Sequence, residues 1–303
     1  MNNLVIKKYD ESIIKSAKQI TKGSGFFSTY DLNDGNIIKV VKTPEECFDG
    51  SNGLFLYSTY NIFIDELYNK LTKSIDIDIP SIVLPNCIYL DNNVPRAYTI
   101  PKQDGFMSIK KYLLNNNDLN TIATTIINIT KEVKKANKNG INMPDLGNSS
   151  NTLIDPKSKK IRFIDYDGMQ IDKYPSFCNS GLIDNNVVPF TSNKNYCDLK
   201  TGLVTNNMDK LSLYALFILY TTKTLLTSFS PPDYRIIDDK LTLKEEVFYN
   251  YTKMIGIDGT ELEKELFKIF FGTDLSYPDS SIKQLLKTHK FDNSYKNIRF
   301  IKK

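Results

Sequence analysis

Three polar residues in one short stretch could together hold a metal ion beside a phosphate. Asp145, Asn151 and Asp165 lie within residues 142–168, where two apolar runs flank the sequence Asp155-Pro156-Lys157-Ser158. That sequence predicts a tight turn, and two short strands joined by a turn bring their outer ends together. Carboxylate and amide oxygens gathered in this way suit Mg²⁺ on a polyphosphate next to a hydroxyl group. A β-hairpin with acidic ends is the alternative.

A second candidate for phosphate chemistry lies near the start of the chain. Gly23 and Gly25 precede the turn Asn33-Asp34-Gly35 and the apolar run 36–42. The pattern predicts three strands within residues 15–42, joined by a loop and a hairpin turn. Glycines in such a loop let the backbone approach phosphates without a Cβ in the way.

Two lysines on the third of these strands compete for a phosphate-binding role. Side chains alternate along a strand, so Ile37, Lys39 and Val41 share one face while Lys42 lies on the other. This alternation separates the two lysines but does not choose between them.

A helix and two further strands must position these residues. Residues 58–73 carry apolar side chains at helical spacing, with Glu66 beside the apolar stripe and Asp65 as a neighbouring alternative. Strands are expected at Ile82–Leu90 and Arg96–Ile100. Regular structure is then expected to break at 101–105.

The rest of the chain predicts mainly helices. A helix over 118–139 has one buried stripe, with Asp118 to cap its start and Gly140 to end it. An almost wholly apolar helix is expected at 207–226, with Asp209 near its start. Shorter helices are expected at 107–115 and near 243–255, 260–271 and 281–288. Residues 169–206 predict a long irregular segment.

In their order and element types, these features resemble the protein-kinase superfamily over residues 15 to 290. The motifs that carry the resemblance are the glycine-rich loop, the strand lysine, the helix glutamate, the catalytic and metal-binding loops and the buried helix: Gly23, Ser24, Gly25, Ser28, Lys39, Glu66, Asp145, Asn151, Asp165 and Asp209. The resemblance implies an α+β fold of two lobes. Residues 1–103 would form a small antiparallel sheet with one helix, and residues 104–303 a larger, mainly helical lobe.

The same resemblance implies a role for each residue. The loop with Gly23, Ser24, Gly25 and Ser28 would surround the phosphates of ATP, Lys39 would contact the α- and β-phosphates, and Glu66 would hold Lys39. Asn151 and Asp165 would coordinate Mg²⁺. Asp145 would orient the acceptor hydroxyl and take its proton, and Asp209 would accept backbone N–H groups of the catalytic loop.

Several positions depart from the family pattern. The family's His-Arg-Asp is Met143-Pro144-Asp145, and Asn151 follows Asp145 by six residues instead of five. The glycine after Asp165-Tyr166-Asp167 comes one place late, which leaves Asp167 as an alternative metal ligand. No Ala-Pro-Glu pattern occurs in 169–206. Three functions therefore stay open: a Ser/Thr-type protein kinase, a kinase of small molecules, and a pseudokinase that binds a nucleotide or a partner.

Composition excludes some other classes of protein. The net charge of +4 over 303 residues is modest and the lysines are scattered, so no nucleic-acid partner is indicated. The four cysteines form no C-x-x-C pair and His289 is the single histidine, which disfavours zinc and a His-based triad. We expect no signal peptide, no membrane-spanning segment and a reducing, cytoplasmic location.

Overall fold

The chain forms a mixed α+β structure that divides into two compact units. The computed structural model describes residues 3–21, 26–47, 53–116, 118–174 and 176, with short stretches and single positions between 181 and 271. The first unit comprises Met1–Phe106 and Arg162–Phe177, and the second comprises Met107–Ile161 and Cys178–Lys303. The sequence prediction drew one boundary at residue 103. The structure has a boundary close to it, but groups 162–177 with the first unit.

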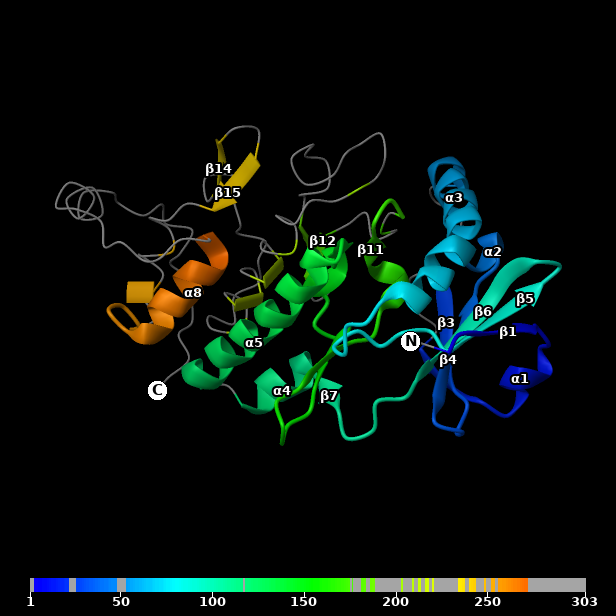
Figure 1. Cartoon of the computed structure of the whole chain (residues 1–303), viewed down its shortest axis with the longest axis horizontal. Helices are drawn as coiled ribbons and strands as arrows, with labels where there is room; N and C mark the ends of the chain where they lie inside the picture. Colours follow the sequence, from blue (N-terminus) through cyan, green and yellow to red (C-terminus); the bar gives the residue numbers. More distant parts are fainter. Residues whose placement is uncertain are drawn as a thin grey trace. The chain divides into compact units, whose positions relative to one another are not determined.

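A six-stranded sheet in the order β1-β5-β6-β4-β3-β2 forms the body of the first unit (Figure 1). β1 runs parallel to β5, and the other neighbours are antiparallel. The strands are β1 Val5–Lys8, β2 Lys18–Thr21, β3 Phe27–Asp31, β4 Asn36–Val41, β5 Cys87–Asp91 and β6 Val94–Pro101. The sequence analysis predicted the last five strands in outline but not β1.

The predicted hairpin between β3 and β4 is confirmed. Asn33 and Gly35 adopt positive φ angles of 60° and 87°, and the Asp34 side chain accepts a hydrogen bond of 3.0 Å from the backbone N–H of Asn36. These residue types tolerate such backbone angles, which is why the turn could be recognised.

The strand predicted at Ile82–Leu90 was wrong in its first half. β5 begins at Cys87, and the preceding segment contains Pro80 and Pro85, which have no N–H to give to a ladder. Residues before Pro85 bond elsewhere: the Val83 N–H donates to the Phe163 carbonyl at 2.9 Å, and the Phe163 N–H donates to the Ser81 carbonyl at 2.7 Å. This pairing ties the segment 162–177 to the first unit.

The two faces of the large sheet are covered by different elements. On one face Ile38, Val40 and Ala97 are buried under residues of the N-terminal segment that contains α1 (Ser12–Lys15). Helix α3 (Gly53–Thr72) packs along the sheet, as Figure 1 shows. Its apolar stripe includes Phe63, whose ring stacks on Phe26 at 4.4 Å and meets Phe27 edge-on at 5.4 Å.

The remaining elements of the first unit are short. They are α2 Pro44–Cys47, η1 Lys73–Asp76, η3 Tyr166–Gly168 and β11 Gln170–Ile171. β10 (Ile161–Phe163) spans the boundary between the units and leads directly to Asp165.

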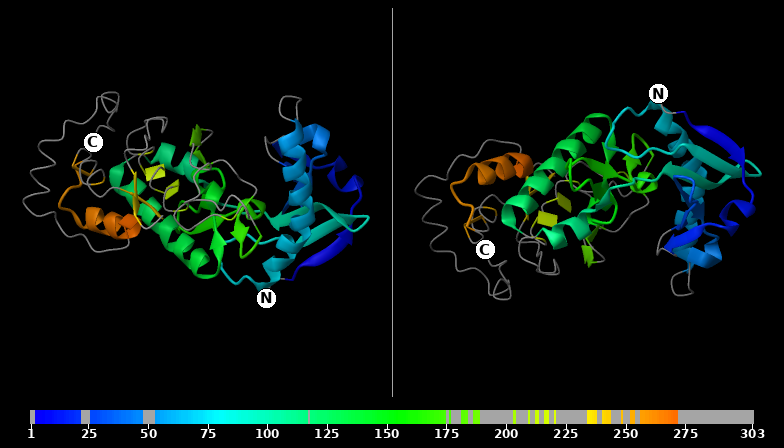
Figure 2. Two further views of the ribbon diagram at one scale, coloured as in Figure 1. Left: turned by 90° about the horizontal axis from the view of Figure 1, so that it is seen from above. Right: turned by 90° about the horizontal axis from the view of Figure 1, so that it is seen from below.

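Helix α5 (Leu119–Lys138) organises the second unit and matches its prediction. Its stripe of Ile122, Ile126, Ile129 and Val133 is buried. Asp118 caps the helix by accepting from the Thr121 N–H at 2.9 Å. α8 (Glu261–Phe271) lies beside α5 in both views of Figure 2. Its first turn is capped by Thr260, whose Oγ1 accepts from the Glu263 N–H at 3.2 Å.

The other described elements of the second unit are also short. They are α4 Ile109–Asn115 and η2 Pro144–Gly147, with strands β7 Met107–Ser108, β8 Ile141–Asn142, β9 Thr152–Ile154, β12 Gly181–Ile183, β13 Asn186–Val188, β14 Tyr234–Ile237 and β15 Lys240–Leu243. Of the helix predicted at 207–226, residues 209, 212–213, 216–217 and 220 are described, and all are helical. The helix predicted near 281–288 lies outside the described residues, as does most of 169–206. Among the helices that are described, none has the length and apolarity needed to cross a membrane.

Candidate functional site

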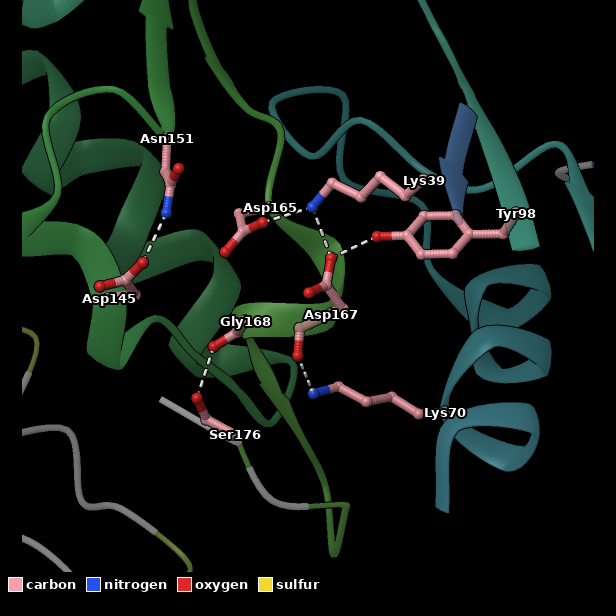
Figure 3. Close-up of polar contacts among 9 residues, drawn as sticks. All are labelled: Lys39, Lys70, Tyr98, Asp145, Asn151, Asp165, Asp167, Gly168 and Ser176. Atoms are coloured by element: carbon pink, nitrogen blue, oxygen red, sulfur yellow. Dashed lines mark hydrogen bonds and ion pairs between the residues drawn. The ribbon is translucent and has the colours of Figure 1, made fainter. Parts of the chain in front are cut away.

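A lysine and two aspartates meet in the first unit. Lys39 lies on β4, opposite Tyr98 of β6, and Asp165 and Asp167 lie on the loop after β10. The Lys39 ammonium group forms an ion pair with Asp165 and a second one of 2.6 Å with Asp167 (Figure 3). These side chains are only 12%, 23% and 14% exposed, so water screens the charges weakly.

Asp167 has contacts beyond its ion pair with Lys39. Besides Lys39, the Tyr98 hydroxyl donates to the Asp167 carboxylate, and the Lys70 ammonium donates to the Asp167 backbone carbonyl at 2.6 Å. Tyr98 is fully buried and its ring also lies 5.9 Å from Lys39 Nζ. The Asp167 carboxylate therefore accepts from two side chains.

Burial and charge act in opposite directions at these groups. Burial disfavours the charged form of Lys39, but the two carboxylates outweigh it and hold the pKa of Lys39 well above its ordinary value. Burial and the neighbouring Asp167 raise the pKa of Asp165. Burial also opposes the ionisation of Asp167, but Lys39 and the Tyr98 hydroxyl lower its pKa overall. Asp167 is thus the more firmly ionised of the two.

A second pair of predicted residues meets in the second unit. The Asn151 amide nitrogen donates to the Asp145 carboxylate at 2.6 Å, as Figure 3 shows. Successive turns span the six positions from Asp145 to Asn151. The Asn148 N–H bonds to the Asp145 carbonyl at 3.0 Å, and the Asn151 N–H bonds to the Asn148 carbonyl at 2.9 Å. The tight turn predicted at Asp155 closes the following hairpin, with the Lys159 N–H donating to the Asp155 carbonyl at 2.8 Å.

Asp209 supports the chain just before Asp145. Its carboxylate accepts from the Met143 N–H at 2.9 Å and from the Asn137 side-chain amide at 2.7 Å. The carboxyl group is 1% exposed. Burial outweighs both hydrogen bonds and raises the pKa of Asp209 to about 7.

Other predicted residues are placed differently. Glu66 is half-buried on α3, and within the described part of the chain it makes no ion pair with Lys39. Ser28 pairs with Val40 across β3 and β4, which puts it on the face of the sheet opposite to that of Lys39. Gly23, Ser24 and Gly25 lie outside the described residues. Asp165 belongs to the first unit and the pair Asp145–Asn151 to the second.

The sequence analysis missed Tyr98 and Lys70. Lys70 had a detectable signal, because it lies three residues after Leu67 and therefore on the apolar side of α3. The signal for Tyr98 was weaker, since alternation along β6 shows on which face of the sheet Tyr98 lies but not that it pairs with Lys39.

Asp165 and Asp167 are residues that could hold Mg²⁺ together with phosphate and water. Among the described residues, no three His, Cys, Asp or Glu side chains gather as a ready cation cage. Mg²⁺ needs none, because it usually takes one or two carboxylates and completes its shell with phosphates and water. Asp165 and Asp167 could provide those carboxylates, and Lys39 could provide a charge for a phosphate.

Comparisons with known proteins add no assignment. No protein-family model matches the chain, and no curated protein matches it.

Proposed function

We propose that the chain is an ATP-dependent phosphotransferase with a protein-kinase-like fold, which transfers the γ-phosphoryl group of Mg-ATP to a hydroxyl acceptor. The observation that carries the proposal is the ion pairing of Lys39 with Asp165 and Asp167. Asp165 lies 126 residues after Lys39 in the sequence and Asp167 lies 128 residues after it, and the fold brings the three side chains together.

The charges at this point match those of Mg-ATP. Lys39 and the two aspartates now neutralise one another in part. A bound nucleotide would give each a new partner of the right sign, since Mg²⁺ attracts the aspartates and the phosphates attract the lysine. The exchange of partners keeps every buried charge compensated, which limits the cost of opening the ion pairs.

The pair Asp145–Asn151 supports the acceptor half of the reaction. The hydrogen bond from the amide fixes the Asp145 carboxylate, and Asn151 also carries an amide oxygen of the kind that Mg²⁺ prefers. Asp209 orders the backbone at Met143, two residues earlier. In the proposed reaction Asp145 orients the hydroxyl and takes its proton, while phosphoryl transfer relies on positioning and charge neutralisation.

The order of the elements supports the finer fold assignment. A glycine-containing segment, the lysine strand β4, helix α3, the strands β5 and β6 and then the helices α4 and α5 follow one another in the order that the resemblance implies. β1 is an addition to that pattern.

One observation favours a second candidate, a pseudokinase. In an active kinase the strand lysine pairs with the helix glutamate, whereas here Lys39 pairs with both aspartates and Glu66 does not join it. A chain that kept this arrangement with nucleotide bound would bind it without transferring phosphate.

Transfer from γ-labelled ATP with Mg²⁺ distinguishes these functions. The reaction is followed on a protein gel and on a thin-layer plate, with generic proteins and small alcohols as acceptors. We expect label on a protein or a small molecule with the wild type. Asp145→Asn should reduce transfer by at least about 100-fold, because it removes the base. Lys7→Met, on the exposed strand β1, is the control and should behave as wild type.

Each other outcome is also informative. Nucleotide binding without transfer by the wild type favours the pseudokinase. Transfer by Asp145→Asn at the wild-type rate contradicts the assignment of Asp145.

A further inference from the structure

One buried charge has no place in the reaction described so far. Lys70 lies near the end of α3 and is fully buried. An ammonium group in such a place costs several kcal/mol unless it is hydrogen-bonded and its charge is compensated. A lysine on the apolar side of a helix therefore points to a specific contact.

Two hydrogen bonds run in opposite directions between Lys70 and the aspartate loop. The Lys70 ammonium donates to the Asp167 backbone carbonyl at 2.6 Å (Figure 3). The Tyr166 hydroxyl donates to the Lys70 backbone carbonyl at 3.0 Å. Tyr166 is also fully buried, so both bonds are shielded from competing water.

The charge of Lys70 also reaches the carboxylates. Burial raises the pKa of Asp165 and works against the ionisation of Asp167, and Lys70 joins Lys39 in opposing that effect at both residues. Lys70 thus stabilises the ionised form that a cation would need.

Resting on the proposed function, we propose that Lys70 is a positioning residue that couples helix α3 to the loop of Asp165 and Asp167. Glu66 lies one turn earlier on α3 and makes no ion pair with Lys39 in the described structure. Lys70 instead donates a hydrogen bond to the main chain of the loop itself. A shift of the end of α3 therefore moves both carboxylates together.

Hydrogen exchange of the protein without nucleotide tests the coupling directly. Lys70→Met keeps the length and apolar stem of the side chain but removes its donor and charge. We expect exchange at least about tenfold faster in residues 164–171 and in the last turn of α3, with the sheet β3-β4-β6 unchanged. Lys73→Met is the matched control, since Lys73 is half-exposed and pairs only with neighbouring Asp76 among the described residues.

The Mg²⁺ dependence of nucleotide binding tests the consequence for the site. For Lys70→Met we expect about tenfold more Mg²⁺ to be needed for half-maximal ATP binding, with recovery at high Mg²⁺. A lysine that only stabilises the fold would lower the melting temperature without changing this Mg²⁺ requirement.

Tyr166→Phe provides a second, milder variant in case Lys70→Met does not fold. It removes one hydroxyl and should accelerate exchange in the same two segments. The proposal is overturned if the variant that folds exchanges like Lys73→Met, or if exchange rises uniformly across the first unit. If a variant exchanges faster in these two segments but the wild type binds no nucleotide, the coupling stands and the proposed function is refuted.

Discussion

One lysine faces two aspartates at the site, and the two are not equivalent. Asp167 accepts from Lys39 and also from the hydroxyl of the fully buried Tyr98, and the pKa of Asp167 is lowered whereas that of Asp165 is raised. We therefore expect Asp167→Asn to destabilise the protein more than Asp165→Asn, by about 1–3 kcal/mol, because it disturbs a buried tyrosine hydroxyl as well as the ion pair. Urea unfolding of the two variants measures the difference. Equal losses would show that the bond to Tyr98 contributes little.

Asp209 makes stability depend on pH. Its pKa is raised from 3.8 to about 7 in the folded protein, so the folded state binds a proton that the unfolded state has released. The contribution of this proton is complete below about pH 4 and is lost as pH rises towards 7, with a slope of up to about 1.4 kcal/mol per pH unit.

Asp209→Asn removes the titrating group, so the variant is the reference for the pH dependence of the wild type. The free energy of unfolding should therefore fall more steeply for the wild type than for the variant between pH 4 and 7. Urea titrations at several pH values provide the comparison, and parallel profiles would contradict the raised pKa.

Residue positions that follow from local rules were predictable at the site. Strand alternation separated Lys39 from Lys42, and the resemblance, with Ile37 in the position two before the lysine, favoured Lys39. The structure places Lys39 against the aspartates. The partner of Lys39 was not predictable, because Glu66 and Asp167 both have the right charge and only the tertiary structure decides between them. Lys70 could have been noticed as a charge on an apolar helix face.

At the scale of elements, helix α3 is held on the sheet in part by the aromatic ring of Phe63. Phe63 is 1% exposed and packs on the rings of Phe26 and Phe27. Phe63→Ala should cost about 3–5 kcal/mol of stability, because it leaves a cavity between helix and sheet. Asn69→Ala, on the exposed side of the same helix, should change stability by less than about 0.5 kcal/mol. Similar unfolding midpoints for both variants in urea would refute this account of the packing.

Elements with strong local signals matched the sequence prediction, and those with non-local pairing did not. α5 has a cap, a buried stripe and Gly140 at its end, with φ of 73°, and all three follow from local sequence. β1 has four exposed residues and exists through parallel pairing with β5, more than seventy residues away. No periodicity in the sequence marks such a strand.

At the scale of the whole molecule, the division into two units was only partly predictable. The break after residue 103 followed from Pro101 to Gly105, and the structure divides near it, after Phe106. The return of 162–177 to the first unit depends on hydrogen bonds of Phe163 to Ser81 and Val83, which are distant in sequence. The loop of Asp165 and Asp167 is thus part of the unit that carries Lys39.

Calorimetric titration with Mg-ATP tests the central claim, that Lys39, Asp165 and Asp167 bind the nucleotide. We predict binding by the wild type and by Lys7→Met. Lys39→Met should bind at least about tenfold more weakly, because it loses a charge-assisted contact to phosphate. Asp165→Asn should lose the dependence on Mg²⁺, since it removes a carboxylate from the metal. Absence of binding at millimolar Mg-ATP, or equal binding by Lys39→Met and Lys7→Met, would contradict the claim.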